Sequence, residues 1–266
     1  MLYNQPRENR KNMSIAFTVL FFVGFGLAAY LLGSIPTARI IGHFYGVDIT
    51  KYGSHNAGGT NVGRVLGWKN AIVTMFLDAM KVYLPCTIAM LLLVYGNLYL
   101  IDFPHQREIL SGLIGLCAAL GHSFPIYCRF RGGKCVSCFA GYLLFVSPIL
   151  FGIGLAVFAL VMALGHRVSL ASVTVAPSMI LFSLIFMILD LTILPEDNRF
   201  NGGMYYSPDY MIHLSYVTTI VIILFVILVL LRHRTNIDRL KKKEEPETVF
   251  KSHRQLKQEM KENNLR

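Results

Sequence analysis

The segment from Gly53 to Arg64 combines glycine, hydroxyl, amide and guanidinium groups in one loop. Glycines let backbone N–H groups converge on an oxyanion, hydroxyls add donors, and a guanidinium binds phosphate through two parallel hydrogen bonds. We therefore predict an anion-binding loop, although the same residue types also favour a flexible turn. The candidate ligands are Ser54, Asn56, Thr60, Asn61 and Arg64.

A second polar segment runs from Gly121 to Lys134 and ends in Arg-Gly-Gly-Lys, directly before an apolar stretch. Free N–H groups and the dipole at a helix start both favour phosphate. Cys128 and Cys135 stand where a nucleotide-binding P-loop needs Gly and Ser or Thr, so nucleotide hydrolysis is not indicated. The alternative is that the basic residues anchor a helix end at an anionic membrane surface. The candidates are His122, Arg131, Gly132, Gly133 and Lys134.

A third polar block follows the last apolar stretch, from Arg232 to Leu240, with Glu245 beyond it. His233 and Asn236 are three residues apart, so on a continued helix they face the same way. A histidine here either transfers a proton near neutral pH or, when charged, caps a helix C-terminus. The pattern leaves both roles open.

Charged and hydroxyl residues also occur within or beside the apolar stretches. Asp78 and Lys81 are three residues apart inside one of them, and charges within a membrane are candidates for a functional site. A buried structural ion pair is the equal alternative. Ser169 follows the turn at Gly165 and is either a hydroxyl at a helix start or a substrate ligand.

Two short patterns suggest other chemistry. His43 and Asp48 fit the His-x4-Asp dyad of another acyltransferase class, but the downstream blocks of that class are missing. Cys135 and Cys138 suggest a redox or metal pair, yet zinc needs four ligands and no second cysteine pair is present. We therefore expect no metal site, no cofactor and no disulfide framework.

Membrane-spanning helices must position these residues. The chain of 266 residues is 54% hydrophobic and 15% charged, with a mean hydropathy of +0.52. Soluble domains carry roughly 25% charged residues, and transmembrane barrels alternate apolar and polar residues, which these stretches do not. We predict an all-α polytopic membrane protein with about seven spans, near residues 14–35, 71–96, 109–127, 136–147, 149–165, 170–194 and 212–231.

The distribution of charge predicts an orientation. Pro148 splits the apolar region 136–165 into two spans, so the termini lie on opposite sides. Lys and Arg then place the N-terminus outside and the C-terminus in the cytoplasm, together with the polar loops. Eleven of the 25 Lys and Arg residues follow Leu231, which indicates anionic lipid rather than nucleic acid as the partner of the tail. We divide the chain into an N-terminal tail (1–13), a membrane domain (14–240) and a basic C-terminal tail (241–266).

The three polar blocks resemble the bacterial acyl-phosphate:glycerol-3-phosphate acyltransferases, the PlsY family, over nearly the whole chain. The family's block Gly-Ser-x-Asn-x-Gly-Ala-Thr-Asn-Val-x-Arg is matched up to Arg64, with Gly59 in place of Ala. Its Gly-His-x-x-Pro and Gly-Gly-Lys-Gly block is matched from Gly121, with Cys135 in place of the last Gly. Its Arg-His-x-x-Asn-Ile-x-Arg-Leu block is matched from Arg232, and a later Glu follows at position 245.

The resemblance implies transfer of an acyl group from acyl phosphate to the 1-hydroxyl of glycerol 3-phosphate, which gives lysophosphatidic acid and phosphate. This is the first step of phospholipid synthesis, and it implies an enzyme of the cell membrane. The expected partners are the two substrates and membrane lipid, without nucleic acid or an obligatory protein partner. A transporter of a phosphorylated solute is the alternative from another class, although the chain shows no internal repeat.

In this scheme the Gly-Gly-Lys loop cradles glycerol 3-phosphate, while the first block binds acyl phosphate and its developing oxyanion. The third block completes the site. The proton acceptor is either His233 or the phosphate of the substrate, and a covalent Ser54 intermediate is a minor alternative. The expected catalytic residues are Ser54, Arg64, Lys134, His233 and Asn236.

Overall fold

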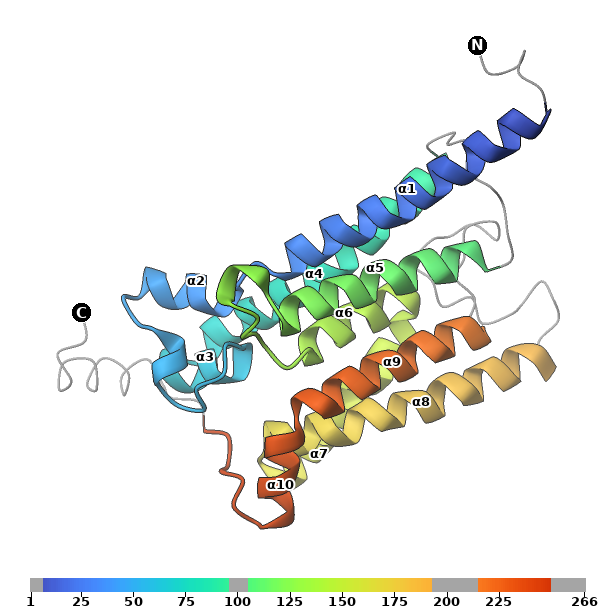
Figure 1. Cartoon of the computed structure of the whole chain (residues 1–266). Coiled ribbons are helices and arrows are strands. Elements are labelled where there is room, and N and C mark those ends of the chain that lie inside the picture. The colour runs from blue at the N-terminus through green and yellow to red at the C-terminus, as the bar shows by residue number, and fades with distance from the viewer. Residues whose placement is uncertain (1–6, 96–104, 193–214, 250–266) are drawn as a thin grey trace.

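The computed structural model describes residues 7–95, 105–192 and 215–249, and all regular structure in these ranges is helical. Long apolar helices form a bundle (Figure 1). Each of them overlaps one predicted span. They are α1 (Arg7–Gly33), α4 (Trp68–Tyr95), α5 (Gln106–Ser123), α6 (Val136–Val146), α7 (Pro148–Gly165), α8 (Val168–Thr192) and α9 (Tyr216–Arg232).

The long helices differ in whether they could cross a membrane. Within the described ranges, five are long and apolar enough to do so alone: α1, α4, α5, α7 and α8. α9 passes the same test only together with α10 (Arg234–Lys241), from which it is bent by 63°. The 11 residues of α6 rise about 16 Å, roughly half of a hydrocarbon core. The all-helical bundle is confirmed, whereas seven complete spans and the sides of the termini stay predictions.

The break that Pro148 predicts is confirmed. Ser147 separates α6 from α7, and its Oγ accepts a hydrogen bond from the backbone N–H of Leu150 at 3.3 Å. Proline suits the first position of the new helix because its missing N–H would be unpaired there in any case. The short α6 therefore ends inside the bundle, where it packs against α4 and α7.

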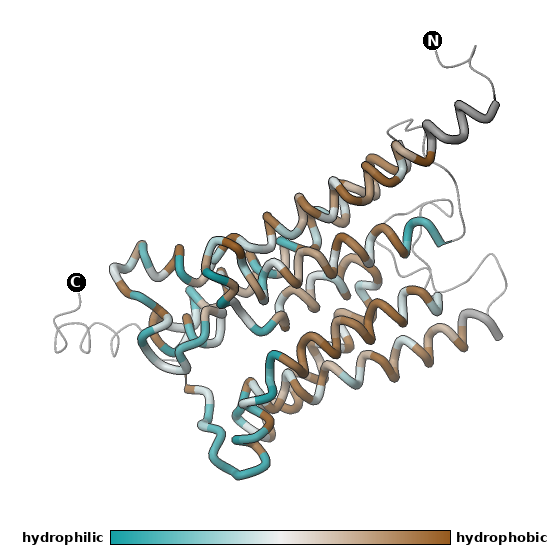
Figure 2. Tube along the Cα trace, viewed as in Figure 1, coloured by the Kyte–Doolittle hydropathy of each residue, from teal (hydrophilic) through white to brown (hydrophobic). Residues whose placement is uncertain are grey.

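Short helices gather at one end of the bundle, opposite the start of α1 (Figure 1). Figure 2 shows that hydrophilic residues concentrate at this end, while the long helices are mostly hydrophobic. The helix does not continue straight through His233, because the chain bends there between α9 and α10. Besides α10, the elements at this end are α2 (Thr37–Phe44), η2 (Ile49–Lys51), α3 (Gly59–Leu66) and η3 (Ile126–Cys128).

Aromatic stacking holds α6 against α9 in the core. The rings of Tyr142 and Phe225 stack with centroids 4.8 Å apart, and the rings of Phe139 and Phe225 stack at 5.5 Å. All three side chains are buried. Such pairs contribute about 0.5–1.5 kcal/mol beyond the area that they bury.

Glycine brings α6 onto the backbone of α4. A Cβ added at Gly141 would lie 2.2 Å from the carbonyl oxygen of Ala79. Small residues permit this close approach of helix backbones, which is the common way for helices to associate in membranes. The contact lies next to Asp78, so it also fixes the level of α6 against the polar part of α4.

We predict that Gly141→Ala lowers the midpoint of thermal unfolding by about 3–10 °C, because the methyl group meets backbone that cannot yield. Gly152→Ala is the matched control, since a Cβ at Gly152 meets nothing within 4 Å. Thermal unfolding in detergent measures both variants. Equal midpoints for the two variants would contradict the close contact between α4 and α6.

Candidate active site

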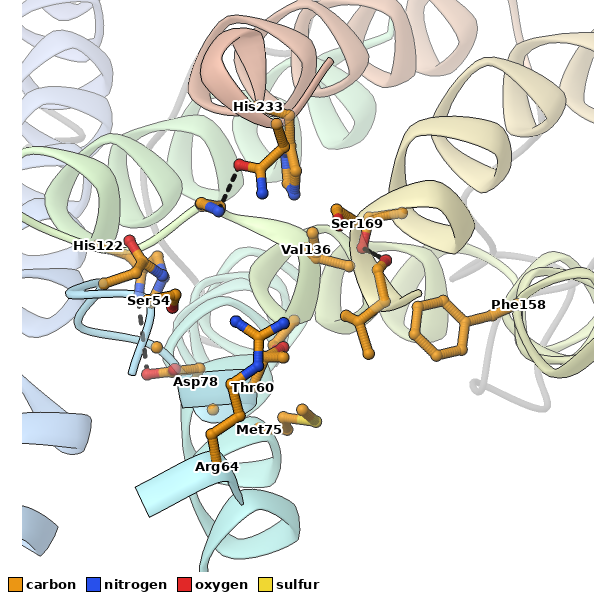
Figure 3. A pocket seen from close by; sticks show the side chains of 18 of the residues that line it. Ser54, Thr60, Arg64, Met75, Asp78, His122, Val136, Phe158, Ser169 and His233 are labelled. Carbon is orange, nitrogen blue, oxygen red and sulfur yellow. Dashed lines mark hydrogen bonds and ion pairs between the residues drawn. The ribbon is translucent and has the colours of Figure 1, made fainter. Parts of the chain in front are cut away.

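A polar pocket of about 100 Å³ lies between α3 and α10 at the polar end of the bundle. Figure 3 shows Arg64 and His233 pointing into it from opposite sides, with Ser54 on one flank and Phe158 on the other. Most of the predicted site residues line this pocket, namely Ser54, Asn56, Thr60, Arg64, Asp78, His122, Lys134, Ser169, His233, Asn236 and Glu245.

Glu245 joins the start of α8 to α10 through its carboxylate. It accepts hydrogen bonds from the Ser169 hydroxyl, from Asn236 Nδ2 at 2.7 Å and from Arg239 Nε at 2.7 Å. Burial favours the neutral acid, but these hydrogen bonds and the charge of Arg239 outweigh it and hold the pKa of Glu245 below its usual value. Glu245 is therefore an anion held in a fixed position in the pocket.

The segment after α10 is fastened to the turn between α7 and α8. The backbone N–H of Thr248 donates to the carbonyl of His166 at 2.8 Å, and its hydroxyl accepts from the N–H of Val168 at 3.1 Å. Arg167 Nε donates to the backbone carbonyl of Glu245 at 2.7 Å. These contacts pair free N–H and C=O groups at two helix ends, and they hold Glu245 in the pocket.

Lys134 points at α10 from the loop before α6. Its Nζ donates to Asn236 Oδ1 at 2.5 Å. Burial, together with the positive charges of Arg239 and Arg64, lowers the pKa of Lys134 to about 8, against the opposing effect of Glu245. An anion that enters the pocket would favour the charged form of this lysine.

His233 presents a hydrogen-bond acceptor to the pocket. Its Nδ1 lies 2.8 Å from the carbonyl oxygen of Val229. A carbonyl can only accept, so the proton is on Nδ1 and Nε2 keeps its lone pair. Burial and the charge of Lys134 lower the pKa of His233 to about 4. The ring is therefore neutral near pH 7. His233 does not act as a charged helix cap, which was one of the two roles that the sequence left open.

The first polar block forms a loop that leads into α3. Gly58, Gly59 and Thr60, at the start of α3, line the pocket, so its N-terminal backbone faces the space where an anion would lie. A Cβ on Gly59 would lie 2.5 Å from the Met75 side chain, which explains the small residue. Burial lowers the pKa of Arg64, and its guanidinium points into the pocket (Figure 3).

Asn61 does not line the pocket. Its amide donates to the carbonyls of Ile49 and Tyr52 at 2.8 and 3.0 Å, and its Oδ1 accepts from the N–H of Ser54 at 2.7 Å. Asn61 therefore holds the anion-binding loop in shape from behind. The backbone N–H of Ser54 is thus hydrogen-bonded to Asn61, whereas the Ser54 side chain lines the pocket.

A buried ionic cluster supports the pocket. Asp78 accepts hydrogen bonds from the Thr37 hydroxyl and from Lys81 Nζ at 2.7 Å, and His122 Nδ1 lies 3.5 Å from the same carboxylate oxygen. Lys81 also donates to Thr37 and to the carbonyl of Ile35. Its three donors are thus used inside the protein, which supports the structural ion pair, while Asp78 and His122 still border the pocket.

The glycine loop rests on His122. Gly133 N–H donates to the carbonyl of His122 at 3.0 Å, and a Cβ on Gly133 would lie 2.0 Å from His122 Nε2. The carbonyls of Gly132 and Gly133 accept from Arg232 at 2.9 and 3.1 Å. The structure places these glycines and Arg131 beside the pocket rather than in its lining, and their role as a cradle for glycerol 3-phosphate stays a prediction.

An apolar groove of about 510 Å³ continues from the polar pocket between α4, α6, α7 and α8. Ile72, Phe76 and Leu155 line it and are more than half exposed, so the groove opens on the apolar side of the bundle. Sequence reasoning missed these residues, because an apolar residue in an apolar helix gives no signal. The residues shared by groove and pocket are Met75, Val136, Ser137, Phe158 and Ser172.

The His-x4-Asp pattern forms no catalytic dyad. Both Asp48 contacts go to Thr50, at 3.0 Å to its N–H and 2.7 Å to its hydroxyl, where Asp48 caps η2. Neither His43 nor Asp48 lines the polar pocket. The class of acyltransferase that uses this dyad is therefore not supported.

Cys135 stands in a backbone conformation that favours glycine. Its φ is +68°, in the left-handed region, and it directly follows Lys134 at the start of α6. The left-handed conformation costs a residue with a Cβ about 1–2 kcal/mol. The thiol is buried and free, as are those of Cys86 and Cys138.

We predict that Cys135→Gly is more stable than Cys135→Ala by about 1 kcal/mol. Both variants lose the thiol, but only glycine relieves the left-handed backbone, so the usual preference for alanine over glycine near a helix is reversed. Unfolding midpoints of the two variants measured side by side test this. An alanine variant as stable as the glycine variant would show that position 135 carries no strain.

Comparisons with known proteins agree with this site. The sequence model of the family described as Glycerol-3-phosphate acyltransferase matches residues 23–243. The glycerol-3-phosphate acyltransferase of Streptococcus gordonii is 37% identical over 220 residues, which cover 82% of this chain and 89% of the relative. That of Geobacillus kaustophilus is 33% identical and covers 84% and 94%.

Solved structures extend the likeness to the fold. A crystal structure of PlsY (YgiH), an integral membrane glycerol 3-phosphate acyltransferase in its glycerol 3-phosphate form, matches with a TM-score of 0.67 and 29% identity, over 86% of this chain and 96% of that chain. Its lysophosphatidic acid form matches with a TM-score of 0.65 and 30% identity, over 85% and 94%. These acyltransferases favour an enzyme over the transporter alternative. The chain is a multi-pass membrane protein that belongs to the glycerol-3-phosphate acyltransferase family.

Proposed function

We propose that this protein transfers an acyl group from acyl phosphate to the 1-hydroxyl of glycerol 3-phosphate and releases lysophosphatidic acid and phosphate. The observation that carries the proposal is the continuity of a cationic pocket with an apolar groove. The pocket suits phosphate groups through Arg64 and Lys134, and the groove suits an acyl chain. A substrate that spans both places its acyl carbonyl at their shared boundary.

The proposed reaction needs no covalent enzyme intermediate. The glycerol hydroxyl oxygen forms the new ester bond to the acyl carbon, and the bond between that carbon and the phosphate oxygen breaks. Phosphate leaves with the electron pair, while Arg64 and Lys134 stabilise its charge. The hydroxyl proton passes to His233 Nε2 or to a phosphate oxygen of the substrate. Asn236 and Glu245 hold Lys134 in place for this step.

The proposed setting is the cell membrane, with the pocket on its cytoplasmic face. The positive-inside distribution of Lys and Arg supports this side. The start of α1 and the helix α10 lie at opposite ends of the bundle, as an odd number of crossings requires (Figure 1). The proposal thus counts α6 as one crossing, in addition to the five long helices and the bent pair of α9 and α10. Residues 14–240 then form the membrane domain between the two tails.

The first test is phosphate release by the purified protein with palmitoyl phosphate, with and without glycerol 3-phosphate, beside a parallel reaction with acyl-CoA. We expect release that requires both substrates, and an inert acyl-CoA, because the leaving group must fit a pocket built for phosphate. Turnover of acyl-CoA at an equal rate would refute the acyl phosphate donor. The absence of any turnover in a folded protein would refute the proposal that it is an enzyme of this kind.

We predict that kcat/KM for glycerol 3-phosphate falls as the pH rises through about 8. Lys134 has its pKa lowered to about 8, so it is charged below that pH and neutral above it. A lysine with an ordinary pKa would keep its charge to about pH 10. Lys134→Arg stays charged, so its profile should remain level to higher pH. A wild-type profile that is level up to pH 9.5 would contradict this role of Lys134.

We predict that His233→Ala lowers kcat by about 100-fold or more and changes KM less, because the lost group acts on the hydroxyl during transfer. His233→Gln separates the two proton paths. A glutamine that restores kcat to within about tenfold indicates that His233 orients the hydroxyl, whereas equal losses in both variants indicate a base. Full activity of His233→Ala would remove this residue from the mechanism.

A further inference from the structure

Thr248 is bonded through both its backbone and its side chain to the turn between α7 and α8. Its N–H donates to the carbonyl of His166 at 2.8 Å, and its hydroxyl accepts from the N–H of Val168 at 3.1 Å. Val168 is the first residue of α8, so this N–H has no partner within its own helix. We call these two hydrogen bonds, together with the one from Arg167 Nε to the carbonyl of Glu245 at 2.7 Å, the clasp.

The clasp acts on a segment that has no regular structure of its own. Residues 244–249 follow α10 as an extended chain, in which Glu245 is buried, Thr248 is half-buried and the other side chains are exposed. The described hydrogen bonds from residues 245–249 to the bundle are those of the clasp and those of the Glu245 carboxylate. A long contact of 3.9 Å also joins Arg167 to Glu247. The position of Glu245 along the start of α8 therefore depends on the clasp.

Glu245 is connected to Lys134 through Asn236. Asn236 Nδ2 donates to Glu245 Oε1 at 2.7 Å, while its Oδ1 accepts from Lys134 Nζ at 2.5 Å. One amide serves both partners because its oxygen accepts and its nitrogen donates. A shift of the carboxylate would turn this amide and weaken its bond to the lysine. The contacts thus run without a break from Thr248, outside the pocket, to Lys134 inside it.

Lys134 lies among cations, and the carboxylate of Glu245 opposes them. Burial lowers the pKa of Lys134 to about 8, and Glu245 keeps it from falling further. Asp78 also lines the pocket, but it is already paired with Lys81 at 2.7 Å. The other charged or titratable groups around Lys134 are Arg64 from α3, His122 from α5, Arg232 and His233 from the end of α9, and Arg239 from α10.

We propose that Thr248 is a positioning residue of the pocket, which holds Glu245 and thereby keeps Asn236 and the charged Lys134 in place. Thr248 does not line the pocket, so it acts through Glu245 and not on a substrate. It also lies beyond residues 23–243, which the family model matches. The inference rests on the proposed function for its meaning, because there Lys134 is a cation that stabilises phosphate.

The loss of the Thr248 hydroxyl has a consequence with a definite sign. The N–H of Val168 loses its acceptor, and the segment that carries Glu245 is released from the start of α8. Because Glu245 raises the pKa of Lys134, a loosened Glu245 lets that pKa fall. We expect Thr248→Val to lower the pH at which Lys134 loses its proton by about 0.5–1 unit, since an opposite charge is moved away. Thr248→Ser keeps the hydroxyl and should restore the wild-type value.

The experiment measures the protonation of Lys134 without turnover. The purified full-length protein in detergent is labelled with a trace of an acid anhydride between about pH 6 and about pH 10, a range that includes the ordinary pKa of lysine near 10.4. Mass spectrometry then gives the fraction of Lys134 that is modified. Only the neutral amine reacts, so the pH dependence gives the midpoint. Val249→Thr is the matched control, because this neighbouring side chain is 70% exposed and the exchange is the reverse one. It should leave the midpoint unchanged.

Glu245→Gln tests the route of the effect. Loss of its charge should lower the Lys134 midpoint at least as far as Thr248→Val does. Adding Thr248→Val to Glu245→Gln should then change nothing further, because the two residues act in series. An equal additional shift in the double variant would show that Thr248 does not act through Glu245, and the proposal would fail.

An unshifted Lys134 midpoint in Thr248→Val would also overturn the proposal, even if the protein unfolds at a lower temperature. A clasp that only stabilises the fold changes the unfolding temperature and leaves the charge of Lys134 as it is. The same shift in Val249→Thr would overturn it as well, since any disturbance of the segment would then suffice.

The labelling needs no substrate, so its outcome is separate from that of the proposed reaction. A shifted midpoint in a protein that turns over no acyl phosphate would retain the role of Thr248 and refute the reaction. Turnover with an unshifted midpoint would do the reverse. Where both hold, the pH at which kcat/KM for glycerol 3-phosphate falls should move down in Thr248→Val together with the Lys134 midpoint.

Discussion

The Asp78 carboxylate lies where four helices of the bundle meet, and its charge must be matched at that point. Thr37 reaches it from α2, Lys81 from α4 and His122 from α5, while its backbone carbonyl accepts the thiol of Cys138 on α6 at 3.3 Å. Removing one partner of a buried pair leaves an uncompensated charge and costs about 3–5 kcal/mol. The helices are thus held in one relative position, and the loop that carries Lys134 is built on this cluster through His122.

The pocket itself carries more positive than negative charge. Asp78 lines it but is already paired with Lys81. Arg64, Lys134 and, at the edge, Arg239 therefore share Glu245, the one remaining anion among the described residues that line the pocket. Burial is the main reason that the pKa values of Lys134 and His233 are low, and the neighbouring positive charges lower them further. In the proposed reaction a bound phosphate group would restore the balance, and an uncharged competitor would gain nothing from it.

The sequence predicts the polar part of the site well, because polar residues in an apolar chain need a reason. Ser54, Arg64 and His233 stood out for that reason, and the structure brings them to one pocket. The sequence does not reveal which way a polar side chain points. Asn61 therefore resembled a ligand, although its amide donates to backbone carbonyls of the loop behind it. Apolar lining residues such as Phe158 gave no signal, and the 63° bend at His233 occurs without proline or glycine.

The open side of the groove has a kinetic consequence. Because exposed residues such as Phe76 line it, an acyl chain can slide in from the leaflet without crossing water. Hydrocarbon is as apolar outside the groove as inside it, so the chain adds little to the net free energy of binding. Under the proposed reaction, selection would depend on the headgroup, and the rate would follow the mole fraction of donor in the leaflet rather than its bulk concentration. Dilution with inert lipid would slow such an enzyme at a constant amount of donor.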